Sequence, residues 1–259
     1  MPDILFEVKS KIATITLNRP ETRNAFSDEM LFGWAAALRE CQIRDDVHVV
    51  ILTGAGKAFC SGGDIGAMGK DEPGSHLKTY LQTRVHPVAR AAAALEKPYI
   101  CAVNGAATAA GMDMTLYADI RFAAQSARFA ETYVKVGLAP GDGGAFLLPR
   151  LVGLSKALEL LWTGDFLDAE EAQRLGIVSR VLPDDRLMSY TYQFAERLAS
   201  GPALAMRITK KALYDGLRSD MFQALEAISS HMGVLAGTYD HKEGVMAFIE
   251  KRTSKFEGR

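Results

Sequence analysis

The stretch from Asn104 to Asp113 combines small residues with a carboxylate, in the order Asn-Gly-Ala-Ala-Thr-Ala-Ala-Gly-Met-Asp. It lies between an apolar, strand-like run (98–103) and a helical pattern that ends near Tyr117. A strand-to-helix turn of small residues leaves the first helical N–H groups without partners, and the helix dipole is positive at that end. Such a turn can stabilise a developing negative charge, and Asp113 could supply a base within one turn.

A second loop with adjacent glycines, Gly62 and Gly63, lies in the stretch 54–69. An oxyanion needs donors that are fixed in place before the charge forms, and backbone N–H groups flanked by small residues meet that need. The two loops together favour an anion-stabilising site over a merely close-packed helix start.

Two further carboxylates could act with Asp113. Glu131 would share a face with Tyr133 if the segment between them stays extended, because alternate residues of a strand point the same way. Asp142 lies in the Pro-Gly-Asp-Gly-Gly loop 140–144, as a catalytic group or as an Asp-Gly turn residue. The five histidines fall in no triad or metal-ligand spacing, so we expect structural roles for them and no metal site.

The composition is that of an ordinary soluble protein: 259 residues, 48% hydrophobic, 24% charged, with a net charge of −1. No basic block indicates nucleic acid or an anionic membrane as a partner. Cys41, Cys60 and Cys101 are widely spaced, which favours buried free thiols over disulfides or zinc. No leader or membrane-spanning run is visible, so we expect a cytoplasmic protein.

Strand patterns alternate with helical patterns along most of the chain, which predicts an α/β fold with mainly parallel pairing. A hairpin is expected over 4–17, a helix after Ser27 as N-cap, and a capped helix after Asp168. The other expected strands are 47–53, 99–103, 120–123, 127–130 and 177–182, and the other expected helices are 76–95 and 156–162. Only helical patterns follow residue 184. Trp34 and Trp162 fall on apolar helix faces and are expected in the core.

The chain also resembles the crotonase, or enoyl-CoA hydratase/isomerase, superfamily. Five blocks carry the resemblance, in the expected order: 17–25, 57–65, 104–113, 129–150 and 243–252. The resemblance implies a ββα spiral core over 1–183 that binds and transforms the CoA thioester. It also implies a helical extension over 184–259 that completes the CoA site and builds trimers or hexamers. No cofactor is implied, since coenzyme A is part of the substrate.

What the resemblance implies for the site is an enolate held by two backbone N–H groups, those of Gly63 and Ala110. The family usually has glycine at positions 109 and 110, and alanine is expected to exclude backbone angles that only glycine reaches. The family's hydratases use two glutamates, at the positions that Asp113 and Tyr133 occupy here. A phenol, with an ordinary pKa near 10, donates protons at neutral pH rather than removing them.

Asp142 enters through a likeness to the ring-type CoA isomerases, whose catalytic aspartate stands one residue earlier, at Gly141. The candidate catalytic residues are therefore Asp113, Tyr133, Asp142 and Glu131. The resemblance further implies a CoA site that includes Arg23, Ser61, Asp64, Ile65, Phe248 and Lys251, with Lys251 reaching toward a neighbouring subunit. The expected activity is enoyl-CoA hydration, with isomerisation close behind and a non-catalytic binding scaffold as a third reading.

Overall fold

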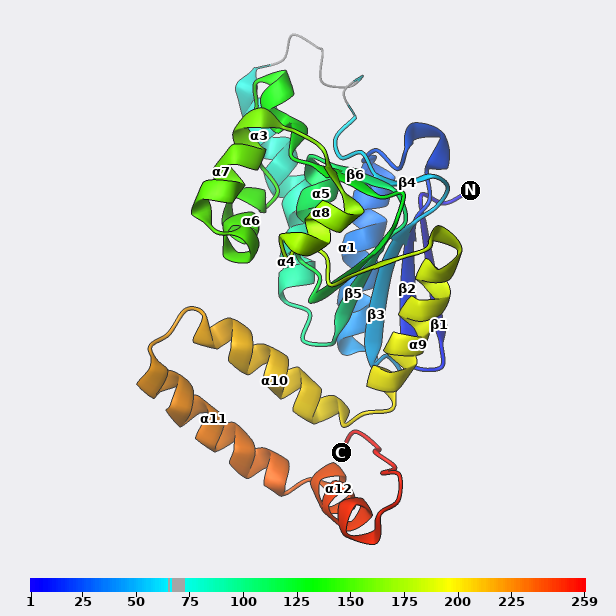
Figure 1. Cartoon of the computed structure of the whole chain (residues 1–259), viewed down its shortest axis with the longest axis vertical. Helices are drawn as coiled ribbons and strands as arrows, with labels where there is room; N and C mark the ends of the chain where they lie inside the picture. Colours follow the sequence, from blue (N-terminus) through cyan, green and yellow to red (C-terminus); the bar gives the residue numbers. More distant parts are fainter. Residues whose placement is uncertain (65, 67–72) are drawn as a thin grey trace.

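The computed structural model describes residues 1–64, 66 and 73–259, and Figure 1 shows an α/β core from which the last three helices extend. The core holds two sheets. The larger has the order β1-β2-β3-β5-β7-β10, with β1 Ile4–Lys9, β2 Ile12–Leu17, β3 Val49–Gly54, β5 Tyr99–Val103, β7 Ile120–Ala124 and β10 Arg180–Leu182. The predicted fold class is confirmed.

Pairing in the larger sheet follows the sequence pattern. β1 and β2 form the predicted antiparallel hairpin, and every later neighbour pairs in parallel. Leu52 of β3 lies opposite Ile15 on one side and Cys101 on the other. β3 and β5 read as continuous apolar runs because a central parallel strand is covered on both faces.

A smaller sheet, in the order β4-β6-β8-β9, runs beside the first. Its strands are β4 Ala58–Cys60, β6 Ala106–Thr108, β8 Arg128–Ala130 and β9 Leu167–Asp168. Each long strand β3, β5 and β7 is thus followed by a short strand in the other sheet, and this repetition gives the spiral. β6 lies inside the stretch 104–113, where only a turn was expected.

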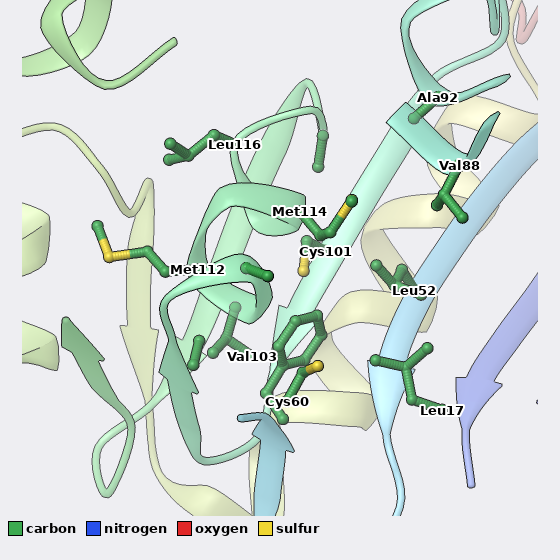
Figure 2. Packing of buried hydrophobic residues seen from close by; sticks show 14 of the residues in the cluster. Leu17, Leu52, Cys60, Val88, Ala92, Cys101, Val103, Met112, Met114 and Leu116 are labelled. Atoms are coloured by element: carbon green, nitrogen blue, oxygen red, sulfur yellow. The ribbon is translucent and has the colours of Figure 1, made fainter. Parts of the chain in front are cut away.

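The core between sheet and helices is filled from several elements. α1 (Asp28–Ile43) begins at the predicted N-cap, where Ser27 Oγ accepts from Met30 N–H at 3.1 Å, and it buries Trp34. Figure 2 shows Leu17, Leu52, Cys101 and Met114 packing together from β2, β3, β5 and α5 (Ala110–Thr115). The site helix α5 is therefore anchored in the main core.

The helix expected over 76–95 is interrupted. It divides into α3 (Gly74–Tyr80), a π-helical turn η2 (Leu81–Val85) and α4 (His86–Ala93). Pro87 explains the interruption, because proline has no N–H for the carbonyl four residues earlier. On the other sheet face, α9 (Leu187–Ala199) covers Ile51, Ile100 and Phe122.

Four elements lie beside the smaller sheet: η3 (Thr132–Val136), α6 (Gly144–Val152), α7 (Leu154–Thr163) and α8 (Ala169–Arg174). α8 begins at the predicted cap, since Asp168 Oδ1 accepts from Glu171 N–H at 2.8 Å. α6 was not predicted. Trp162, expected in the core, is 70% exposed, because the apolar face of α7 that carries it is not covered by this chain.

The chain ends in α10 (Ala203–Gly216), α11 (Met221–Ala236) and α12 (Tyr239–Glu250). Figure 1 shows them leaving the core, with α12 at the end of the molecule opposite β4 and β6. α10 and α11 bury none of their residues in this chain. Two short 3₁₀ turns, η1 (Pro20–Thr22) and η4 (Asp184–Arg186), complete the fold. None of the helices described is both long and apolar enough to cross a bilayer.

Candidate active site

The two small-residue loops lie against each other. Gly62 has a left-handed φ of +82°, and a Cβ there would fall 2.9 Å from the amide nitrogen of Ala110. Thr108 Oγ1 donates to the Ser61 carbonyl at 3.3 Å, and Phe26 N–H donates to the Gly62 carbonyl at 2.8 Å. Only glycine at position 62 lets the loop ending at Gly63 approach the start of α5 this closely.

The start of α5 provides free amide donors. Its first helical bond runs from Asp113 N–H to the Ala109 carbonyl at 3.0 Å, so the N–H groups of residues 110–112 precede it. Ala109 has φ +47° and ψ −124° and is held by its own N–H bond to the Ala130 carbonyl at 2.8 Å. The expectation that alanine excludes such angles was wrong here: the bond to β8 holds Ala109 in them.

Three carboxyl groups converge behind these amides. Asp113 comes from α5, Glu131 from the end of β8, and Asp142 from the loop before α6, and their exposed fractions are only 0%, 1% and 4%. The extended segment on which the pairing of Glu131 with Tyr133 depended does not occur, because residues 132–136 form the η3 turn. The turn nevertheless brings both side chains to Asp113.

Tyr133 joins two of the carboxyl groups. Its hydroxyl oxygen lies 2.9 Å from Asp113 Oδ2 and 2.7 Å from Asp142 Oδ2. The Asp142 backbone N–H also donates to Asp113 Oδ2, at 3.2 Å. Asp113, Tyr133 and Asp142 therefore form one buried hydrogen-bonded chain. We call these three residues and Glu131 the carboxyl–phenol cluster.

Burial dominates the electrostatics of this cluster. It raises the pKa of Asp113 to about 6, with the charge of Asp142 adding to the shift and hydrogen bonds from Glu131, Tyr133 and the Gly144 N–H opposing it. Burial, followed by the nearby Asp113 charge, raises the pKa of Glu131 to about 10, so Glu131 is a neutral acid at pH 7. Burial also raises the pKa of Asp142, opposed by the Tyr133 hydrogen bond and by His86.

Two side chains hold the loop that carries Asp142. Tyr117 donates its hydroxyl to the Asp142 carbonyl at 3.0 Å, and His86 Nε2 lies 3.0 Å from the Gly141 carbonyl. The side chain that reaches Tyr133 is therefore that of Asp142. The neighbouring position 141, where the ring-type isomerases have their aspartate, is a glycine here. The support that Tyr117 gives to the site was not predicted from the sequence. The only sequence signal was its position at the end of the helical pattern that follows the stretch 104–113.

The residues predicted for CoA binding fall into two groups. Arg23 and Ser61 are adjacent, since Ser61 N–H donates to the Arg23 carbonyl at 3.0 Å, and Asp64 is exposed nearby along the chain. Phe248, 85% exposed, and Lys251 belong to α12 and its end, at the far end of the molecule in Figure 1. Ile65 lies outside the described residues.

Asn24 has a structural role in the site that sequence reasoning missed. Its buried amide donates to the carbonyls of Ala55, Ala58 and Phe59 at 3.0, 2.9 and 3.0 Å, and its Oδ1 accepts from Arg19 N–H at 2.8 Å. Asn24 thereby connects the turn at residues 19–24 to β4, the strand that leads into the Gly62 loop. Its position within the first family block was the only available signal.

The arrangement can stabilise an oxyanion and move protons. Free amides flank one side, and behind them lies a buried cluster of carboxyl groups whose pKa values burial raises. No group of three or more His, Cys, Asp or Glu side chains in the described part of the chain is arranged to hold a metal ion. Fold and site together define a protein of acid–base chemistry on a substrate that develops negative charge.

Comparison with known proteins gives the family. The model of the family described as "Enoyl-CoA hydratase/isomerase" matches residues 7–259. The chain is 36% identical over 261 residues to the 1,2-epoxyphenylacetyl-CoA isomerase of Escherichia coli, covering 100% of both chains. It is 36% identical over 257 residues to the short-chain-enoyl-CoA hydratase of Clostridium acetobutylicum, covering 99% of this chain and 97% of that one.

A solved structure agrees with these relatives. The enoyl-CoA hydratase from Bacillus anthracis superposes with a TM-score of 0.94 at 33% identity, covering 99% of this chain and 100% of the other. The chain belongs to the enoyl-CoA hydratase/isomerase family. The predicted crotonase membership, and the enzyme class predicted with it, are confirmed.

Proposed function

We propose that this protein is an enoyl-CoA hydratase that adds water to a 2-enoyl-CoA thioester. The observation that carries the proposal is the buried carboxyl–phenol cluster placed directly behind the amide-bearing start of α5. Relatives at 35–36% identity named crotonyl-CoA and short-chain-enoyl-CoA hydratases support it.

In this proposal the N–H groups of Gly63 and Ala110 donate to the thioester oxygen as the enolate forms. Asp113 accepts a proton from water as the oxygen bonds to the β-carbon. Asp142 in its neutral form donates a proton to the α-carbon. One water is consumed, and one C–O and one C–H bond form. The site returns to its starting protonation once the proton on Asp113 has passed back to Asp142.

A second candidate is enoyl-CoA isomerisation. Tyr133, a phenol at the second glutamate position, favours it, because one base can remove a proton at one carbon and return it at another. The E. coli relative at 36% identity is named an isomerase, which adds support. Isomerisation would use the same amides and the same aspartates, without water.

Turnover with product mass separates the candidates. Crotonyl-CoA and a 3-enoyl-CoA are each incubated with the protein, and the products are analysed by chromatography and mass spectrometry. Hydration adds the mass of one water to crotonyl-CoA, whereas isomerisation moves the double bond of the 3-enoyl-CoA without a mass change. If neither substrate changes, both proposals are wrong and the binding-scaffold reading gains support.

The substrate site extends beyond the acyl group. We propose that Arg23, Ser61 and Asp64, with Ile65, contact the CoA moiety, and that Phe248 and Lys251 complete the CoA site of a neighbouring subunit. α12 and β4, the strand just before Ser61, lie at opposite ends of the molecule in Figure 1, which supports a contribution across a subunit boundary. Loss of affinity for CoA esters in Lys251→Ala, with the circular dichroism spectrum unchanged, is the expected result.

Assembly is the second part of this proposal. Exposed apolar side chains on the last three helices, such as Leu217, Phe222 and Leu225, support a homotrimer or a hexamer. Light scattering after gel filtration should give three or six times the chain mass of 28.1 kDa. A cytoplasmic location and activity without any added cofactor are further parts of the proposal, the second testable with dialysed protein.

A further inference from the structure

The Tyr133 hydroxyl has two carboxylate neighbours but only one proton. Its oxygen lies 2.9 Å from Asp113 Oδ2 and 2.7 Å from Asp142 Oδ2. A phenol can donate that proton to one oxygen at a time, while a carboxylate can only accept. The second short contact therefore requires a proton on one of the two aspartates, which then donates to the phenol oxygen.

The surrounding donors indicate which aspartate holds that proton. Asp113 Oδ2 also accepts from the Asp142 backbone N–H at 3.2 Å, and the presence of Glu131 and the Gly144 N–H beside this carboxylate opposes the rise in its pKa. Donors of this kind favour the charged form. Asp113 Oδ1 and Asp142 Oδ1 both lack a hydrogen-bond partner among the described residues, so the distinction rests on the second donor to Asp113 Oδ2, the Asp142 N–H. The resting arrangement is therefore an ionised Asp113 and a neutral Asp142.

Resting on the proposed function, we propose that Tyr133 is a proton relay that resets Asp113 and Asp142 after each turnover. Turnover leaves Asp113 protonated and Asp142 ionised. The Asp113 proton then passes from Oδ2 to the phenol oxygen as the phenol proton passes to Asp142 Oδ2. Two O–H bonds break, two form, and no co-reactant is needed.

Burial favours this route. Asp113, Tyr133 and Asp142 are 0%, 9% and 4% exposed, so proton exchange with bulk solvent is restricted to water that enters with the substrate. Burial also keeps the pKa of Tyr133 well above its ordinary value, so the hydroxyl passes a proton on without resting as a phenolate.

Other titratable groups lie close to Asp113 and Asp142, each at a different position around them. Glu131 faces Asp113, and His86 on α4 and Tyr80 on α3 lie near Asp142. Tyr117 donates its hydroxyl proton to the Asp142 backbone carbonyl at 3.0 Å, not to a carboxylate oxygen of Asp113 or Asp142. Because Tyr117 holds the Asp142 loop, the control is Tyr190 on α9, a phenol that packs against Phe122 away from the site.

Infrared spectroscopy tests the proton count without any substrate. Protein carrying ¹³C-carboxyl aspartate at pH 7 should show a label-sensitive C=O band of a neutral carboxylic acid. The band should disappear in Asp142→Asn, change frequency in Tyr133→Phe and persist in Tyr190→Phe. Glu131 does not interfere because it is unlabelled. Absence of such a band in the wild type means that both aspartates are ionised, and it overturns the relay.

Rapid-quench kinetics tests the reset. Tyr133→Phe should form about one product per site in a fast first turnover and then slow by about 10²-fold, the usual size of an acid–base contribution. The wild type and Tyr190→Phe should show no such burst. A Tyr133→Phe steady state within twofold of the wild type, or a first turnover as slow as later ones, contradicts the reset. If the wild type itself acts on neither substrate, the proposed function fails, and the infrared band alone decides the relay.

Discussion

Gly144, the first residue of α6, lies against the Asp113 carboxylate: a Cβ at residue 144 would fall 1.9 Å from Asp113 Oδ1 and 3.2 Å from Glu131 Oε1. The first turn of α6 therefore lies directly against the carboxyl–phenol cluster. The nearby Gly144 N–H opposes the rise in the Asp113 pKa that burial causes.

Replacement of Gly144 by alanine should displace Asp113 and lower kcat/KM by about 10²-fold, the usual cost of a misplacement of about 1 Å. Gly233→Ala is the matched control, because a Cβ at that α11 position meets nothing within 4 Å. The control should keep its activity. Steady-state kinetics with circular dichroism checks both, and full activity in Gly144→Ala would show that Asp113 is not held by this contact.

Replacement of Asp113 by asparagine should abolish turnover and leave the affinity for CoA esters nearly intact. The reason is that the amide keeps the shape of the side chain but cannot accept a proton, and loss of a general base costs about 10²–10⁴-fold. Activity assays together with calorimetric titration of a CoA ester check this. If Asp113→Asn stays fully active, the base lies elsewhere, at Asp142 or Glu131.

The pH dependence of stability should carry the signature of Asp113. Burial raises its folded-state pKa to about 6, above the ~3.9 of an unfolded chain. Between these values Asp113 binds more proton in the folded protein than in the unfolded chain, so its contribution to the free energy of unfolding falls as pH rises from about 4 to about 6 and is then level. Denaturant unfolding across this window should show a smaller fall in Asp113→Asn. An identical fall in both proteins would mean that Asp113 does not titrate there.

Replacement of Ala109 by glycine should stabilise the fold by about 1 kcal/mol. Its φ of +47° stores strain of that order in any residue with a Cβ, more than the flexibility that glycine adds to the unfolded chain. Ala107→Gly, in the regular strand β6, is the control and should destabilise instead. Thermal unfolding of the two variants gives the comparison, and a lower Tm for Ala109→Gly would contradict the strain.

The attachment of α10 to the core should depend on Asp119. This carboxylate accepts from Lys210 Nζ at 2.8 Å, from the Tyr214 hydroxyl at 3.0 Å and from Tyr99 N–H at 2.8 Å. Asp119→Asn should raise amide exchange in α10 by about tenfold, since it disrupts a partly buried charged network. Asp215→Asn removes only the exposed partner of Lys211 and should leave exchange in the rest of α10 near the wild-type rate. Equal exchange in the two variants would place the anchor of α10 elsewhere.

Local signals predicted much of the fold. The hairpin and the caps at Ser27 and Asp168 depend on neighbouring residues alone, which is why the sequence patterns located them. β6 was missed because its residues, Ala-Ala-Thr, show no alternation and gain their strand form from pairing with β4 and β8. α6 was missed because two glycines precede it and Pro149 lies within it. Trp162 shows that periodicity defines an apolar face but not what covers it.

The site was predictable residue by residue but not as a unit. Asp113, Tyr133 and Asp142 were each candidates, yet nothing in their spacing shows that one phenol contacts both aspartates. That contact depends on the η3 turn and on the loop held by Tyr117 and His86. The state of Glu131 as a neutral acid likewise follows from burial by distant segments.

The three cysteines have a practical consequence for study of this protein. All are free and buried, and burial raises the pKa of Cys41 and of Cys60 to about 12 and raises that of Cys101 as well. Their thiolates are therefore scarce near neutral pH, and alkylating reagents have little to attack. A single cysteine introduced on exposed α12 would then take up a fluorescent or spin label selectively. Distances between such labels would test the proposed trimer or hexamer without removal of any native cysteine.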